Sequence, residues 1–548
     1  MHEPSWIIDA AGEWSVDLSH MPGGTTPLTQ ELMTHAMPAG MRRVFAELGT
    51  PADTLDVRFV NGFIYTRLRP LLSPDKPAAK LPPKAVLKIA TRLHPEMRRR
   101  NRTAAKVLES APWTKVIDDW HHGGRAAIEA KNLALQDVDL ASLGDVDVIG
   151  HVHACFEHAL AQFEHHFWLH GYDLGPIGLY LYDSVPWGLS ASDLLPLLEG
   201  ASPSTSAPRA ELVRMRAMID DAGATPSTLD EARAVSPAVA AAIDEYLRFH
   251  GGLVFSSYDL DGVTMAERPD LVLSSILTAA EPEARDDLAA TTEATRSRVP
   301  AEHRARFDVL LSQARDAMDL RDDNGPLTAE WTMGLLRRGL LELGGRLAER
   351  GCLAERDHVL ELRSDEITTQ LFDGGPPTAA AVAERAAQRQ WLKTLDPPRR
   401  IGDPEVAPPT SVLPAPLMRM VEMVMLVISQ MGMDGAARKS GLHGCGVGSH
   451  AVRGRACVAA TAEEAFELLE PGDILVVAST TPAYNLVLSI AGGVVTAEGG
   501  PMSHAAVLAR ELGIPAVIGA AAALTDIAHG AEIEVDPVAG EVRVLSRL

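Results

Sequence analysis

The sequence predicts a multidomain chain in which a long, mostly α-helical domain precedes a small α/β domain. Residues 85–395 contain long stretches rich in Ala, Leu, Arg and Glu, separated by short Gly, Pro and Ser breaks, which is typical of packed helices. Residues 396–416 are dense in proline and predict a semi-rigid linker. Residues 441–548 alternate short β-rich runs with helical segments. A chain of 548 residues also exceeds what one ordinary core supports.

The chain begins with a segment that lacks a helical pattern. Residues 6–29 are rich in Pro, Gly and Thr and predict an extended or looping lead-in. Residues 57–66, VRFVNGFIYT, alternate apolar and polar side chains around Asn61-Gly62. This pattern predicts a β-hairpin with a tight turn. We therefore place the mainly helical domain at 1–395, with the hairpin near its start.

The proline-dense segment is followed by a methionine-rich helix. Residues 417–433, LMRMVEMVMLVISQMGM, are strongly apolar, but Arg419 and Glu422 interrupt them and the run is short of a membrane span. We interpret the segment as a packing helix. Together with the preceding prolines it defines a linker region at 396–440.

The last 108 residues predict strands and helices in alternation. Helices are expected at 462–469 and 503–512. Strands are expected around them, and a closing hairpin is expected at the end of the chain. The predicted strands lie at 454–460, 473–479, 493–497 and 516–519, with the hairpin at 532–545.

Composition excludes several classes of partner. There are 50 basic and 73 acidic residues, and the net charge of −23 argues against nucleic acid or an anionic membrane as the main partner. The four cysteines have no C-x-x-C spacing and fit reduced thiols in a cytosol. The N-terminus has neither the basic region nor the apolar run of a signal peptide. We therefore expect a cytoplasmic protein without a membrane or nucleic-acid partner.

The strongest chemical signal lies around His504. Gly499 and Gly500 follow a predicted strand and allow a sharp turn. Ser503 is a good N-cap, and Gly513 is a helix stop signal, so His504 falls in the first turn of a short helix. Free amides and the positive helix end favour an anion there, and a neutral imidazole can form a covalent intermediate. A histidine at a helix start is also an ordinary structural feature, and the spacing alone leaves both interpretations open.

A longer stretch around His504 resembles the phosphohistidine swivelling domain of the PEP-utilising enzymes. The sequence DILVVASTTPAY at 473–484 looks like the family's strand and Thr-Thr-Pro turn, and AGGVVTAEGG at 491–500 looks like the strand that leads to the glycines. ARELGIPAVIG at 509–519 is close to a family signature, and 529–545 is similar to its closing hairpin. The resemblance implies that His504 carries a phosphoryl group.

The same resemblance implies residues that support the phosphoryl group beside the catalytic His504. They are glycines and side chains that surround the start of the helix or follow the preceding strand. These residues are Gly499, Gly500, Ser503, Thr480, Thr481 and Arg510. No metal-ligand set is predicted in the chain.

Met502 distinguishes branches of the family. The dikinase branch usually has threonine at this place, two residues before the histidine, whereas a hydrophobic residue looks more like the rifampin phosphotransferase branch. This similarity points away from pyruvate as the acceptor. Earlier segments resemble the helical substrate-binding domain of that branch, although the sequence at 250–253, HGGL, lacks the arginine of a family element. These segments are 25–29, 60–65, 246–269 and 334–353, together with Arg321.

Two parts of the larger family enzymes have no place in this sequence. We find neither the ATP-grasp domain, with its glycine-rich loop and magnesium-binding carboxylates, nor the PEP-binding TIM barrel. No Walker sequence is present either. The resemblance therefore implies a separate ATP-grasp subunit that binds ATP and Mg²⁺, as in phenylphosphate synthase, where the functions are divided between chains.

Candidates for a substrate pocket lie in the helical part. Residues 151–170 hold six histidines, of which His158 and His165 share a helix face and are candidates for a general base. His166 and His170 have the i, i+4 spacing of a metal pair, although a packed or solvated polar seam is the commoner outcome. Asp259 and Glu267, in a predicted loop between helices, are further candidates. Arg321 is a candidate because of the family resemblance.

Two functional hypotheses follow. In the first, an ATP-derived donor on a partner phosphorylates His504, and the small domain then moves to the helical domain. The phosphoryl group passes there to a small-molecule hydroxyl or carboxyl. In the second, the chain is a non-catalytic phospho-carrier or ligand-binding protein that histidine phosphorylation regulates.

Overall fold

The computed structural model describes most of the chain. The described residues are 4–18, 21, 23–72, 74–75, 79–255, 258–279, 288–373, 375–432, 441–480 and 484–546. They form two compact units. Unit 1 comprises 1–172, 257–262 and 324–422, and unit 2 comprises 173–256, 263–323 and 423–548. Three helices have residues in both units, and they are α6 (Asp145–Ser184), α13 (Arg304–Asn324) and α17 (Ala415–Met431). In the described ranges, no helix is long and apolar enough to cross a bilayer. The predicted boundaries after 395 and 440 stay predictions.

Unit 1 contains a four-stranded antiparallel sheet. Its order is β2-β3-β1-β4, and its strands are β1 (Glu13–Val16), β2 (Ala52–Val60), β3 (Phe63–Pro70) and β4 (Arg400–Gly402). The predicted hairpin is confirmed, because Asn61 and Gly62 join β2 to β3 with φ angles of 51° and 75°. Positive φ at both central residues matches the right-handed twist of paired strands.

Two segments expected to be loop and linker each contribute a strand to this sheet. The lead-in at 6–29 contains β1, and the proline-dense segment at 396–416 contains β4. The first was expected to be an extended or looping lead-in and the second a semi-rigid linker, and neither was predicted to pair in a sheet. The strands are four and three residues long, too short for an alternating pattern to be recognised. Burial of Trp14 against Tyr65 and Ile401 accounts for the pairing.

The remainder of unit 1 is helical, as the sequence predicts. Its helices are α1 (Pro27–Leu48), α2 (Lys84–Leu93), α3 (Pro95–Ser110), α4 (Trp113–Asp119), α5 (Arg125–Gln136), α14 (Trp331–Glu349), α15 (Ser364–Asp373) and α16 (Ala379–Lys393), with most of α6. The π-helical segment η7 (Gly325–Glu330) interrupts this pattern, and η1 (Trp120–Gly124) is a kink between α4 and α5 in which His122 and Gly123 have non-helical backbone angles. π-Helical segments are frequent at functional sites.

Unit 2 combines short helices with the C-terminal sheet. The helices before the sheet are α7 (Ala191–Leu194), α8 (Pro203–Asp221), α9 (Leu229–Val235), α10 (Pro237–His250), α11 (Pro269–Thr278) and α12 (Leu288–Arg298), with parts of α6, α13 and α17. The 3₁₀ segment η4 (Leu195–Leu198) follows α7 directly. A buried apolar cluster that includes Met215, Ile243 and Ile276 joins α8, α10 and α11.

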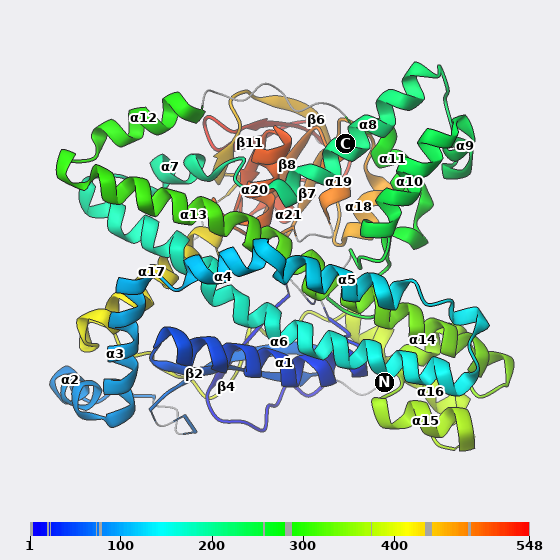
Figure 1. The fold of residues 1–548 in the computed structure, drawn as a ribbon, viewed down its shortest axis with the longest axis horizontal. Coiled ribbons are helices and arrows are strands. Elements are labelled where there is room, and N and C mark those ends of the chain that lie inside the picture. Colours follow the sequence, from blue (N-terminus) through cyan, green and yellow to red (C-terminus); the bar gives the residue numbers. More distant parts are fainter. Residues whose placement is uncertain are drawn as a thin grey trace. The chain divides into compact units, whose positions relative to one another are not determined.

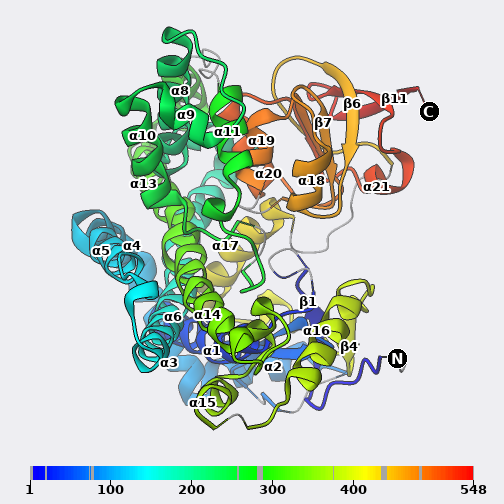
Figure 2. The ribbon, with the colours of Figure 1, turned by 90° about the vertical axis from the view of Figure 1, so that its right-hand side faces the viewer.

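The C-terminal part of unit 2 is the predicted α/β domain (Figures 1 and 2). Its sheet has the order β11-β10-β6-β7-β8-β9-β5, in which β6 to β9 run parallel. The strands are β5 (Cys445–Val447), β6 (Val452–Val458), β7 (Ile474–Val477), β8 (Gly493–Thr496), β9 (Ala516–Ile518), β10 (Glu532–Asp536) and β11 (Glu541–Ser546). The helices are α18 (Ala462–Leu468), α19 (Asn485–Ile490), α20 (His504–Leu512) and α21 (Ala523–Asp526).

Both faces of this sheet are buried, which explains its continuous apolar strands. Leu475 and Val494 belong to the core with α18, α19 and α20, whereas Ile474 and Val495 belong to the core on the other face with α21. The predicted strands, the closing hairpin and both predicted helices are present. The short elements β5, α19 and α21 were not predicted.

Candidate functional site

The candidate site begins at the first residue of α20. Ser503 is its N-cap, and the Ser503 hydroxyl accepts a hydrogen bond from the amide of Ala506 at 3.4 Å. Gly513 ends the helix with a φ of 70°. The predicted cap and stop are both confirmed. His504 consequently lies where the amides and partial positive charge of a helix N-terminus favour an anion.

The loop before His504 approaches other backbone too closely for a side chain at some positions. Gly499 has a φ of 106°, a conformation that favours glycine. A Cβ added at Gly500 would lie 2.4 Å from the carbonyl oxygen of Gln430. That carbonyl accepts a hydrogen bond from the amide of Met502 at 2.8 Å. The close approach of this loop to the end of α17 therefore requires Gly500, whereas the backbone conformation favours glycine at position 499.

Thr480 contacts the imidazole directly. The distance between Thr480 Oγ1 and His504 Nδ1 is 2.8 Å, and Thr480 lies beyond the end of β7, largely buried. The direction of this bond depends on the histidine tautomer. When Nδ1 carries the proton and donates it to Thr480, the lone pair of the neutral ring lies on Nε2. The second predicted threonine, Thr481, lies outside the described residues.

Arg510 contacts the loop that precedes His504. Its guanidinium donates to the carbonyl oxygen of Pro501 at 2.6 Å, and its Nε lies 3.4 Å from the carboxylate of Glu199. Burial lowers the pKa of Arg510. These contacts connect α20 to the segment after η4. A role of Arg510 in supporting a phosphoryl group stays a prediction.

Arg321 reaches the same loop from α13. Its Nη2 donates to the carbonyl oxygen of Met502 at 2.9 Å, two residues before His504. Its Nη1 is buried, and no atom of the described residues accepts a hydrogen bond from it. A buried donor without an acceptor is costly and calls for an explanation. The structure therefore brings Arg321 to the loop that carries His504.

The other candidate residues have contacts of their own. In unit 1, Asp259 is buried and accepts hydrogen bonds from the amide and hydroxyl of Thr26, at 3.0 and 2.6 Å. Burial raises the pKa of Asp259. In unit 2, Glu267 accepts from the amide and hydroxyl of Thr264 and forms a capping box. These bonds give both carboxylates a structural role, and their role with substrate stays a prediction.

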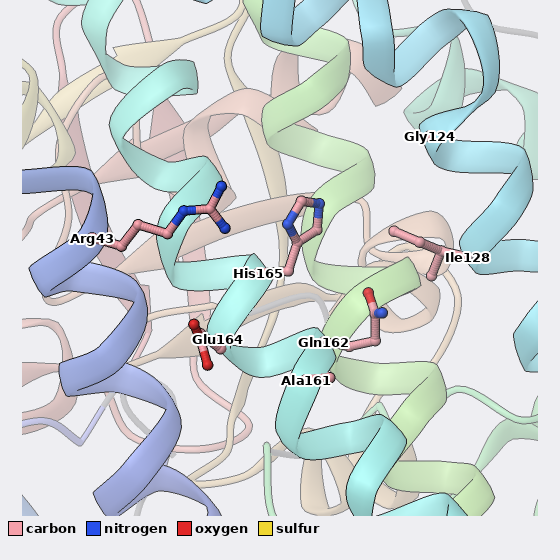
Figure 3. Close-up of a pocket in the computed structure, with 7 residues that line it drawn as sticks. All are labelled: Arg43, Gly124, Ile128, Ala161, Gln162, Glu164 and His165. Carbon is pink, nitrogen blue, oxygen red and sulfur yellow. The ribbon is translucent and has the colours of Figure 1, made fainter. Parts of the chain in front are cut away.

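The histidine-rich stretch lies in α6. His158 Nε2 is 2.8 Å from the Asn132 side-chain oxygen, and burial lowers the pKa of His158 to about 4. The Nε2 atoms of His166 and His170 are 3.2 Å apart. Within the described residues, no three His, Cys, Asp or Glu side chains are grouped so that they could hold a metal ion. His165 lines a cavity of about 340 Å³ together with residues of α1, η1, α5 and α6 (Figure 3).

A buried acid in unit 1 was missed from the sequence. Glu330 ends η7, its Oε1 has no hydrogen-bond partner in the described part of the chain, and burial raises its pKa to about 8. A Cβ built on Gly325 would lie 3.0 Å from the Tyr258 hydroxyl and 3.7 Å from Glu330 Oε1. The Gly-Pro pair at 325–326 inside a helical pattern was the available signal.

Under the prediction that His504 carries a phosphoryl group, replacing Thr480 with valine is expected to slow phosphorylation of His504 by about 10- to 100-fold. Valine keeps the volume but removes the hydroxyl that orients the ring, and such a loss is equivalent to about 1–3 kcal/mol. Incorporation of labelled phosphate at His504 measures the rate. Thr480→Ser should recover most of it. Equal rates for the valine variant and the unchanged protein would contradict the orienting role.

Comparison with known proteins agrees with the geometry of the C-terminal domain. Residues 469–540 match the family model of the PEP-utilising enzyme, mobile domain. The chain is 27% identical to rifampicin phosphotransferase of Streptomyces sviceus over 405 residues, which cover 66% of this chain and 40% of that protein. It is 45% identical to phosphoenolpyruvate synthase of Aeropyrum pernix over 89 residues, which cover 16% of this chain and 11% of that protein.

A third relative is an uncharacterised protein of Mycobacterium bovis. The two are 35% identical over 213 residues, which cover 38% of this chain and 22% of the relative. The chain thus spans less than half of the length of each of these relatives. The matched domain contains the strand, the glycine loop and the helix that position His504. Residues 469–540 are thus similar to the mobile domain of the PEP-utilising enzymes.

Proposed function

We propose that the chain is the phosphoryl-carrying component of a phosphotransferase and that His504 is its carrier residue. The observation that carries the proposal is the contact between Thr480 Oγ1 and His504 Nδ1 at the start of α20. When the proton of the neutral ring lies on Nδ1, this contact leaves the lone pair on Nε2 as the nucleophile. The positive helix end offsets the charge of a phosphoryl group there.

The transfer takes two steps. In the first, the Nε2 lone pair attacks the terminal phosphorus of the donor, the bond from that phosphorus to the donor's bridging oxygen breaks, and its electron pair leaves with the donor. In the second, an acceptor oxygen attacks the phosphorus, the P–N bond breaks, and its electron pair returns to Nε2. The proton of an acceptor hydroxyl passes to a base. The two steps replace one difficult transfer with two easier ones.

The donor is ATP with Mg²⁺ bound by a separate ATP-grasp subunit, and the acceptor is a small-molecule hydroxyl or carboxyl. The similarity to rifampicin phosphotransferase over 66% of this chain supports a phosphotransferase that acts on a small molecule. The glycine loop and the partner of His504 would then serve positioning and charge stabilisation, which provide most of the catalysis in phosphoryl transfer.

The test is to incubate the full chain with γ- and β-labelled ATP and an ATP-grasp protein encoded beside it. We expect acid-labile, alkali-stable label on the peptide that contains His504. Chase with candidate acceptors should move the label to a small molecule. Label that stays on the protein with every acceptor would favour the regulated phospho-carrier instead. Acid-stable label, or none with any donor, would overturn the proposal.

Arg321 should stabilise the phosphorylated loop through its buried Nη1. Arg321→Met is expected to lower the rate of His504 phosphorylation by about tenfold or more, because a hydrogen bond to a charged group contributes about 1.5–3 kcal/mol. Arg321→Lys should recover part of the rate. Arg306→Met, on the same helix with a partly exposed side chain, is the matched control. Equal losses in the two methionine variants would argue against a specific role.

A further inference from the structure

Helix α2 in unit 1 presents a row of apolar side chains to solvent. Val86, Ile89 and Leu93 are 51%, 59% and 68% exposed. Their spacing of three and four residues places them on one side of the helix, and they are called the apolar row below. Single exposed apolar side chains are ordinary on a protein surface, but three that share a face of one ten-residue helix indicate a contact surface.

A row of positive charges runs beside the apolar row. Lys84, Lys88 and Arg92 repeat every fourth residue along α2, and all three are exposed. At about 100° per residue, this basic row lies next to the apolar row rather than opposite to it. In the part of the chain that the structure describes, no carboxylate is paired with these three cations. Both rows are therefore available to a partner that is anionic and apolar.

The remaining face of α2 attaches the helix to unit 1. Thr91 is buried, and its hydroxyl donates to the carbonyl oxygen of Val412 at 2.8 Å. Nη1 of Arg92 donates to the same carbonyl at 3.3 Å. Val412 belongs to the 3₁₀ segment η9 (Thr410–Val412). The helix is thus held by one face, while the apolar row and the basic row stay at the surface.

The charge around α2 is opposite to that of the whole chain. Residues 80–106 hold nine Lys and Arg residues and one acidic residue, Glu96, whereas the whole chain holds 50 and 73. Arg98, Arg102 and Lys106 are exposed on α3, which follows α2 directly (Figure 1). The total charge argues against an anionic membrane as the main partner, but at physiological ionic strength a charge acts over only about 8 Å. Within that range, α2 presents a positive surface.

An anionic lipid surface fits these features better than a protein partner does. Protein interfaces are depleted in Lys and have cores rich in aromatic residues, whereas the exposed part of α2 presents two lysines and three aliphatic side chains. Three such side chains also cover much less than the about 800 Å² per partner of a stable protein interface. An interfacial helix needs only an apolar face together with Lys and Arg side chains that reach the head groups.

We propose that α2 binds the surface of an anionic bilayer. The apolar row inserts below the head groups, and the basic row contacts the anionic lipids. The contact is reversible, because one short helix buries far less apolar surface than a transmembrane helix does. The inference is separate from the proposed function, so His504→Ala should bind vesicles as the unchanged protein does.

The test is co-sedimentation of the full chain with vesicles made of equal parts of phosphatidylcholine and phosphatidylserine. We expect binding in about 0.1 M salt and its loss in about 1 M salt, because the Debye length falls from about 10 Å to about 3 Å. Vesicles of phosphatidylcholine alone should bind about tenfold or more weakly. Equal binding to both kinds of vesicle, or none to the anionic vesicles, would overturn the proposal.

A charge variant locates the contact. Lys84→Gln/Lys88→Gln is expected to weaken binding to the anionic vesicles by about tenfold or more, because each cation near the surface raises the affinity severalfold. Lys115→Gln/Lys131→Gln is the matched control, since it removes two exposed lysines from α4 and α5 and changes the net charge equally. Equal weakening in the two double variants would overturn the assignment to α2.

An apolar variant tests the insertion. Leu93→Ser should weaken binding to the anionic vesicles by about fivefold or more, because serine inserts no aliphatic group. Val146→Ser is the control, since Val146 on α6 is 65% exposed, against 68% for Leu93. Unchanged binding by Leu93→Ser would overturn the insertion. Self-association of the unchanged chain that Leu93→Ser abolishes, without binding to vesicles, would assign this face to a protein partner and overturn the proposal.

Discussion

His504→Ala is expected to lose phosphoryl transfer almost completely, by about 1,000-fold or more, because the variant has no nucleophile at the start of α20. The fold should persist, since His504 is only half-buried and the N-cap of the helix is Ser503. Incorporation of label and the appearance of phosphorylated acceptor measure the effect. Circular dichroism before the assay confirms that the helices remain.

His529→Ala is the matched control for this variant. His529 lies in the same domain, is exposed, and is separate from the glycine loop and α20. It should incorporate label at the rate of the unchanged protein. Full transfer by His504→Ala would remove the central role of this residue. Loss in both variants would point to damage of the domain rather than of the site.

Glu330→Gln is expected to stabilise unit 1 at alkaline pH and to flatten its dependence on pH. Burial raises the pKa of Glu330 from its usual value of 4.5 to about 8. The folded state therefore keeps a proton that the unfolded state releases. The stability that this proton contributes is complete below about pH 4.5 and is lost as the pH rises through about 8. At about 1.4 kcal/mol per pKa unit, the loss is at most about 5 kcal/mol.

Denaturant unfolding at pH 5 and pH 8.5 measures this effect. The free energy of unfolding should fall more steeply with pH in the unchanged protein than in Glu330→Gln. Glu355→Gln is the control, because the Glu355 side chain is 77% exposed. It should follow the unchanged protein at both pH values. Parallel pH profiles for Glu330→Gln and the unchanged protein would show that this carboxyl is ionised in the folded state.

The C-terminal domain was the most predictable part of the fold, and its chemistry explains why. Glycines, an N-cap and a stop signal around His504 act within a few residues, so local rules determine α20. The mainly apolar strands β7 and β8 were equally clear, because both their faces are buried. The contact between Thr480 and His504 joins positions 24 residues apart. The resemblance named Thr480 as a residue that supports a phosphoryl group but did not indicate its contact with the ring.

Contacts between distant segments were beyond sequence reasoning. The strand β4 pairs with β1 across almost 400 residues, and neither is long enough to show a period. Asp259 was proposed as a loop residue for function, but its bonds with Thr26 become visible only when positions 233 residues apart meet. The cavity beside His165 likewise depends on residues of α1, η1, α5 and α6. The sequence indicated the histidine but not Arg43 or Gln162.

The backbone contact between Gln430 and the loop before His504 provides an intrinsic reporter of motion. The Met502 amide donates to Gln430, and a Cβ at Gly432 would lie 2.4 Å from the carbonyl carbon of Gly499. Any departure of the loop from α17 must break that hydrogen bond and expose the amide to water. Hydrogen–deuterium exchange at Met502 therefore measures how often the loop separates, without a label and without a substitution.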